Sequence, residues 1–118
     1  MLRKFLAAVV QLDTQADKKE NLERVCAFID EAAGRGAKLI AFPENINYIG
    51  ENPIGDRAPE TIPGQTTEIL SKKAKEYGVY LHGGSMAELI PGDTRFYNTN
   101  VMFRSEEHTS ELQSPNTI

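Results

Sequence analysis

Glu44 is the residue whose type and position most directly suggest chemistry. It follows an apolar stretch at residues 39–42 and then Pro43. A carboxylate is therefore expected at the mouth of a buried strand, held there by a rigid proline. In partly apolar surroundings such a carboxylate makes a good general base, because poor solvation strengthens its hold on a proton. An ordinary exposed loop glutamate fits the same position, and the residue alone does not separate the two interpretations.

Other side chains could complete a site around this carboxylate. Tyr48, with Asn45 and Asn47, could contact a substrate, or the three could belong to a mobile loop. Tyr97 and Asn98 could support the site from behind, although strand packing is the simpler role for both.

The single cysteine and the two histidines do not suggest a second site. Cys26 falls on the apolar side of the first predicted helix, where a buried structural cysteine is favoured over a nucleophile. His82 lies inside an apolar strand and His108 lies near the C-terminus, so no metal site is expected. The polar, solvated face of the second predicted helix is expected to carry Lys72, Lys73 and Lys75.

The hydrophobic pattern predicts four strands and two helices. The strands are expected at residues 4–12, 38–42, 79–89 and 96–103, the first of them covered on both faces. The first helix is expected to start after a cap at Asp17, with Glu20 completing a capping box, and to end at Gly34. The second is expected at about residues 65–77, with Gly78 as its stop.

This alternation of strands and helices indicates an α/β fold. The order β-α-β-α-β-β predicts a mainly parallel sheet, with an antiparallel hairpin strand after Leu89. Such sheets bind ligands beyond the carboxyl ends of their strands, which is where Glu44 falls. The long segment at residues 43–64 is expected to be functional or mobile. A dinucleotide-binding half-domain is disfavoured, because residues 12–15 lack a glycine-rich turn and residues 83–85 lack its spacing.

The composition places the chain in the globular class and narrows its partners. Of the 118 residues 40% are hydrophobic and 25% charged, and the net charge is −4, which disfavours nucleic acid and anionic membranes as partners. One cysteine excludes an internal disulfide and fits a reducing compartment. Residues 3–10 superficially resemble a secretory signal, but the run meets Asp13 without a cleavage site, and no apolar stretch approaches the roughly 20 residues that cross a bilayer. A cytoplasmic protein is expected.

Several motifs in order resemble the N-terminal part of the nitrilase, or carbon–nitrogen hydrolase, superfamily. The similarity covers about residues 4–103. The motifs are the strand at 8–12, the helix at 21–34, the strand at 36–44 that ends in Pro-Glu, Tyr77-Gly78-Val79, and Phe96-Tyr97-Asn98-Thr99. The resemblance implies the N-terminal part of an α-β-β-α sandwich, in which Glu44 matches the catalytic glutamate of the Pro-Glu motif.

The resemblance also implies a mechanism based on Glu, Lys and Cys. In the family the glutamate takes the proton of a cysteine thiol, and the thiolate attacks the carbon of a small amide or nitrile. The lysine stabilises the tetrahedral intermediate, and water hydrolyses the thioester without a metal or organic cofactor. Both partners normally follow the Tyr-Asn-Thr strand, so this chain is expected to be inactive alone. It looks most similar to omega-amidases and deaminated-glutathione amidases, and the whole protein is expected to be a homo-oligomer.

The C-terminal segment differs from the rest of the chain. Residues 105–118 hold three carboxylates and no lysine or arginine. Residues 104–114 resemble the conceptual translation of a sequencing adapter, and a natural disordered acidic tail fits the composition as well. The chain is therefore predicted to divide into a truncated hydrolase domain at residues 1–103 and a disordered tail at residues 104–118. A non-catalytic α/β binding or scaffold module remains the alternative, because fold similarity does not fix function.

Overall fold

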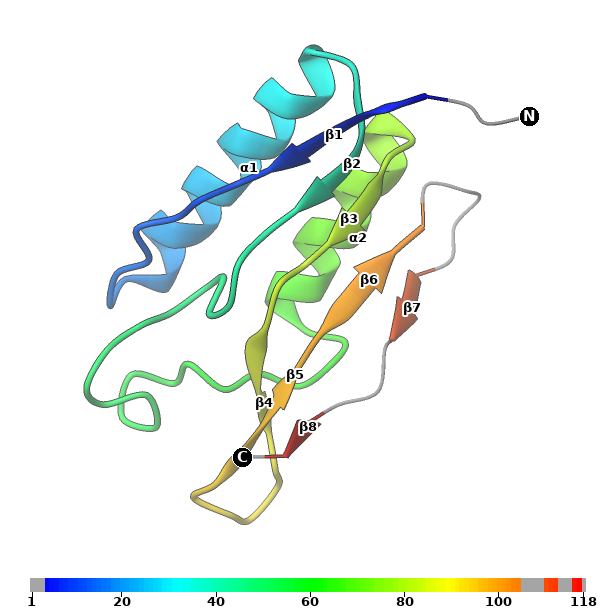
Figure 1. Ribbon diagram of the computed structural model, residues 1–118. Coiled ribbons are helices and arrows are strands. Elements are labelled where there is room, and N and C mark those ends of the chain that lie inside the picture. The colour runs from blue at the N-terminus through cyan, green and yellow to red at the C-terminus, as the bar shows by residue number, and fades with distance from the viewer. Residues whose placement is uncertain (1–3, 105–109, 113–115, 118) are drawn as a thin grey trace.

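The computed structural model describes residues 4–104, 110–112 and 116–117. The chain alternates strands and helices in the predicted order before ending in further short strands (Figure 1). The helices are α1 (Lys18–Gly34) and α2 (Gln65–Tyr77). The strands are β1 (Leu6–Val9), β2 (Ala37–Ala41), β3 (Tyr80–His82), β4 (Met86–Leu89), β5 (Phe96–Thr99), β6 (Val101–Phe103), β7 (Ser110–Leu112) and β8 (Asn116–Thr117).

The strands form two sheets. The larger has the order β1-β2-β3-β6-β7, with parallel pairing from β1 to β3 and antiparallel pairing from β3 onward. The smaller has the antiparallel order β4-β5-β8. The predicted α/β fold with a mixed sheet and an antiparallel hairpin is therefore confirmed.

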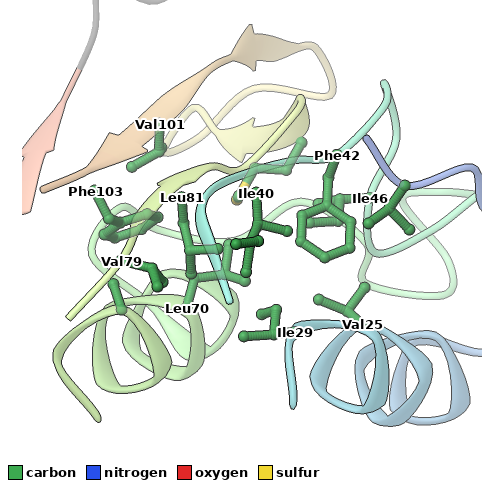
Figure 2. Packing of buried hydrophobic residues seen from close by; sticks show 14 residues of the cluster. Val25, Ile29, Ile40, Phe42, Ile46, Leu70, Val79, Leu81, Val101 and Phe103 are labelled. Carbon is green, nitrogen blue, oxygen red and sulfur yellow. The ribbon is translucent and has the colours of Figure 1, made fainter. Parts of the chain in front are cut away.

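Both helices cover the same face of the larger sheet (Figures 1 and 2). Alternate strand residues such as Ile40 and Leu81 point toward them and are fully buried. The helices supply Val25 and Ile29 from α1 and Leu70 from α2. Each such aliphatic side chain contributes roughly 1.5–3 kcal/mol through burial. This one-sided core holds β2 and β3, the strands whose carboxyl ends lie beside Glu44.

The helix boundaries follow the predicted signals closely. The Asp17 side chain accepts a hydrogen bond from the Glu20 backbone N–H, and Gly78 ends α2 with a left-handed φ of 62°. The Glu20 side chain does not close the predicted capping box, because it pairs with Arg24 one turn further along α1. Only the first bond of the capping box, from the Glu20 N–H to the Asp17 side chain, is therefore formed. The Glu20 side chain forms an exposed ion pair with Arg24 in place of the second bond.

Two of the predicted strands are each split in two. The stretch at 79–89 breaks at Gly83, Gly84 and Ser85, so that β3 stays in the larger sheet while β4 passes to the smaller one. The stretch at 96–103 breaks at Asn100 and divides in the same way into β5 and β6. The uninterrupted strands predicted from sequence were wrong, because both segments change sheets at these residues.

Strand β1 is shorter and more exposed than predicted. It lies at the edge of the larger sheet, and the Val9 side chain, which points away from the helices, is 88% exposed. Leu6 is 53% exposed. The expectation of cover on both faces was therefore wrong for the described part of the chain, whose helices lie on one face alone (Figure 1).

The predicted division at residue 103 remains a prediction. Of residues 104–118 the structure describes Arg104 and the backbones of β7 and β8, which pair with β6 and β5. The other residues of the predicted tail, including His108, lie outside the described residues.

The exposed apolar side chains of β1 predict binding of a hydrophobic dye. Exchanging both Leu6 and Val9 for threonine keeps strand propensity while removing apolar surface, so dye fluorescence should fall. Ile54→Thr is the control, because Ile54 is 44% exposed but lies outside β1, in the segment at 43–64. Equal dye fluorescence for the double variant and the control would show that the β1 surface is not the dye site.

Candidate active site

Glu44 stands just beyond the carboxyl end of β2. The Phe42 N–H donates a hydrogen bond of 2.9 Å to the carbonyl of His82, so the pairing of β2 with β3 continues to the residue before Pro43. Glu44 itself is exposed, and its carboxylate forms no hydrogen bond or ion pair with the described residues. The structure places this carboxylate where the sequence predicted it, but the described residues do not give it the apolar surroundings that were expected.

The backbone that follows Glu44 is held by Ser85, the residue directly before β4. The Asn45 N–H donates to the Ser85 hydroxyl at 3.0 Å, and the Ile46 N–H donates to the Ser85 carbonyl at 3.0 Å. Asn45 adopts a left-handed φ of 53°, which asparagine tolerates better than most residues. The Ile46 side chain is fully buried. An exposed carboxylate is thus carried by an anchored turn.

Gly84 makes this turn possible through a close approach of two backbones. A Cβ on Gly84 would lie 1.8 Å from the Pro43 carbonyl oxygen, and Gly84 has a φ of +65°. Only glycine meets both conditions without strain. Sequence analysis considered residues 83–85 only as a ligand loop and missed this role. The available signal was a pair of glycines inside an apolar strand, which is typical of close backbone approach.

Tyr48 and Asn47 are both buried, in different surroundings. The Tyr48 hydroxyl donates to the Asp56 carboxylate, and this hydrogen bond, followed by desolvation, raises the pKa of Tyr48. The tyrosine lines a cavity of about 190 Å³ together with Asn45, Pro53 and others. The Asn47 amide donates to Glu60 and Thr66, so it is held inside the protein and does not face a mobile loop surface.

The remaining predicted site residues occupy opposite faces of the β4–β5 hairpin. Asn98 lies opposite Ala87 and shares a face with Phe96, and both Ala87 and Phe96 line the cavity beside Tyr48. Tyr97 lies opposite Glu88, and strand alternation places it on the other face. The structure therefore brings Asn98, but not Tyr97, to the side of the hairpin on which Tyr48 lies.

Cys26 lies in a different part of the molecule, near Lys73 of α2, whereas Lys72 and Lys75 line a separate groove. Cys26 lines a groove between α1 and α2 and is half-buried, less than predicted. Burial raises the pKa of its thiol, with Lys73 acting in the opposite direction. Lys72 and Lys75 are exposed as predicted, whereas Lys73 reaches Asp30 of α1 at 2.6 Å. Glu44 does not line that groove.

Neither a metal site nor a membrane span emerges from the described residues. Within them no cluster of three histidine, cysteine or acidic side chains could hold a metal ion. His82 accepts a hydrogen bond at 3.2 Å from the Gly84 N–H through Nδ1, consistent with its expected structural role. No helix in this part of the chain is both long and apolar enough to span a bilayer.

The chain belongs to the carbon–nitrogen hydrolase family. The sequence model of that family matches residues 6–114. Over 102 residues the chain is 42% identical to omega-amidase NIT2-B of Xenopus laevis, and over 103 residues it is 41% identical to omega-amidase NIT2 of Homo sapiens. The matches cover 86% and 84% of this chain but only 36% and 35% of those proteins, so the chain spans about a third of their length.

Solved structures of the nitrilase superfamily share the fold. Nit3 of Saccharomyces cerevisiae, a member of branch 10 of that superfamily, matches with a TM-score of 0.73 at 27% identity, over 94% of this chain and 42% of that one. The NitFhit protein of C. elegans matches with a TM-score of 0.79 at 19% identity, over 96% of this chain and 27% of that one. The family predicted from the sequence motifs is confirmed.

The contact between Gly84 and Pro43 predicts an unusually costly glycine substitution. Gly84→Ala should lower the free energy of unfolding more than Gly92→Ala does, by about 1–3 kcal/mol, the usual cost of overpacking. Gly92 is a matched control, since its φ of +75° is similar but a Cβ there meets no atom within 4 Å. Denaturant titration of both variants measures the difference. Equal losses would mean that the close approach to Pro43 does not constrain the fold.

Proposed function

We propose that the chain is the N-terminal part of an amidase in which Glu44 is the general base. The observation that carries this proposal is an exposed, unpartnered carboxylate on an anchored turn at the carboxyl end of β2, among the described residues. Membership of the carbon–nitrogen hydrolase family and similarity to omega-amidases support amide hydrolysis as the reaction. The substrate class proposed is small linear amides with a non-peptide C–N bond.

The chemistry begins with proton transfer to Glu44. The carboxylate accepts the proton of a cysteine thiol, and the thiolate attacks the amide carbonyl carbon to form a tetrahedral intermediate. A lysine ammonium stabilises the negative charge on the carbonyl oxygen. Glu44 returns the proton to the leaving nitrogen, ammonia departs, and a thioester remains. Glu44 then removes a proton from water, which hydrolyses the thioester to the carboxylic acid and regenerates the thiol.

The cysteine and lysine are proposed to lie outside residues 1–118. Cys26 is half-buried in the groove between the helices, where the pKa of its thiol is raised, and neither property suits a nucleophile. Lys73 is engaged with Asp30 in the same region. The whole protein is proposed to be a cytoplasmic homo-oligomer that needs no metal or organic cofactor.

The 118-residue chain should show no amidase turnover, whereas the protein from the extended reading frame should hydrolyse monoamides of dicarboxylic acids. In that longer protein Glu44→Gln should lower kcat by about 10²–10⁴-fold, because glutamine cannot accept the proton. Ammonia release measures turnover. Glu51→Gln is the matched control, since Glu51 is an exposed carboxylate of the same segment.

Two results would contradict the proposal. The first is amide hydrolysis by the 118-residue chain that depends on Glu44. The second is an extended protein with no downstream lysine and strand-end cysteine, which would favour the binding or scaffold module.

A further inference from the structure

Glu60 is a nearly buried carboxylate that the proposed chemistry does not use. Its side chain is 9% exposed and meets donors from three parts of the fold. One oxygen accepts from the Thr66 N–H at 2.8 Å, in the first turn of α2. The other accepts from the Thr66 hydroxyl at 2.6 Å and from the Asn47 amide at 3.1 Å, and lies 3.0 Å from Lys18 Nζ of α1.

The backbone of Glu60 is anchored as well. Its N–H donates to the Ala87 carbonyl at 3.1 Å, and its carbonyl accepts from the Leu89 N–H at 2.8 Å, so the residue lies alongside β4. Strand β4 begins directly after Ser85, which holds the backbone of Asn45 and Ile46. Two anchors of the segment at 43–64 therefore depend on the same strand.

The path from Glu60 to Glu44 is short. Asn47 follows Glu44 by three positions; its side chain is held by Glu60, and its carbonyl accepts a 2.9 Å hydrogen bond from Asn21 of α1. The turn that carries Glu44 is thus attached at two places. Ser85 holds the backbone of Asn45 and Ile46, and Glu60 holds the side chain of Asn47. Release of Glu60 would weaken the second of these attachments, leaving Asn47 with its bonds to Asn21 and Thr66.

The contacts of Glu60 require a carboxylate. Each of its partner groups is a donor, and a glutamine in its place would turn an NH₂ group toward some of them. Lys18 is the charged group that pairs with Glu60, whereas Thr66 and Asn47 contribute neutral donors. Glu88, the β4 residue in register with Glu60, is a second carboxylate, and it accepts a hydrogen bond from the Thr99 hydroxyl. Burial is the largest influence and acts to raise the pKa of Glu60, but the hydrogen bonds from Thr66 and the pairing with Lys18 together hold that pKa below its ordinary value.

We infer that ionised Glu60 is a positioning residue, which fastens Asn47 and the start of α2 to β4 and thereby fixes the turn that carries Glu44. This inference rests on the proposed role of Glu44 as the base. Glu60 does not itself exchange protons with substrate, since its oxygens are occupied by donors. The depressed pKa means that the anchor is complete above the ordinary value of 4.5 and is lost as the pH falls through the lower value of the folded state.

The test measures backbone amide signals and hydrogen exchange in the 118-residue chain. In the wild type, the Asn45 and Ile46 amides should lose exchange protection as Glu60 titrates below pH 4.5, while the Val10 amide, bonded to Ala41 in the sheet, should not. Glu60→Gln should abolish this transition and lower the exchange protection of Asn45 and Ile46 by about tenfold, as expected for a lost charged hydrogen bond. Glu51→Gln should leave both unchanged.

The wild-type titration decides the matter even where Glu60→Gln does not fold. The inference would be overturned if the exchange protection of the Asn45 and Ile46 amides did not change during the titration. It would also be overturned if protection were lost at these amides and at Val10 together, since Glu60 would then support the fold as a whole.

In the extended protein Glu60→Gln should lower kcat about tenfold with KM nearly unchanged, because the substitution alters the position of the base and not a contact with the substrate. Failure of all amidase activity would refute the proposed function, while the amide titration would still report on Glu60.

Discussion

The close approach of Gly84 to the Pro43 carbonyl is the constraint on which the rest of the structure depends. Two backbone segments meet there at a distance that no side chain permits, and the meeting point lies where β2 and β3 both end. Because the chain turns at Gly84, it leaves the larger sheet and enters the smaller one as β4. The same turn brings Ser85 within reach of Asn45 and Ile46. The contact between Gly84 and Pro43 therefore lies where the chain passes from one sheet to the other, and beside the turn that carries Glu44.

The second support acts through side chains and charge. Glu60 gathers donors from α1, α2 and the segment at 43–64, and hydrogen bonds to a charged group contribute about 1.5–3 kcal/mol each. Lys18 also donates to the carbonyls of Arg57 and Ala58, so the ion pair and these backbone bonds close the segment onto α1. The long segment is thereby integrated into the fold at both ends, while Glu44 stays open to solvent.

Local signals explain what could be predicted from the sequence. Asp17 and Gly78 mark helix ends through their own conformations, and the apolar run before Pro43 located β2 and hence Glu44. The sheet change at Gly84 was missed because it depends on a backbone forty residues away, as the contact from Asn45 to Ser85 shows. The hydrophobic pattern gives only the spacing of apolar residues, and because β3 and β4 both have that spacing, the two strands were predicted as one.

Glu60 was missed for the same physical reason. Its neighbours Pro59 and Thr61 give no sign of burial, and its partners come from Lys18, Asn47 and Thr66. The sequence predicted that β1 is covered on both faces, whereas Leu6 and Val9 are exposed. An apolar run indicates that a strand is suited to burial, but it does not show which segment covers each face.

The central claim is that Glu44 is an exposed side chain on a fixed backbone. The ¹⁵N relaxation order parameters of the Glu44, Asn45 and Ile46 amides test this most directly, because they report motion of that turn on the picosecond to nanosecond timescale. Values of about 0.85, equal to those of the core strands β2 and β3, are predicted. Values below about 0.6 at these residues, with rigid β2 and β3, would contradict the account.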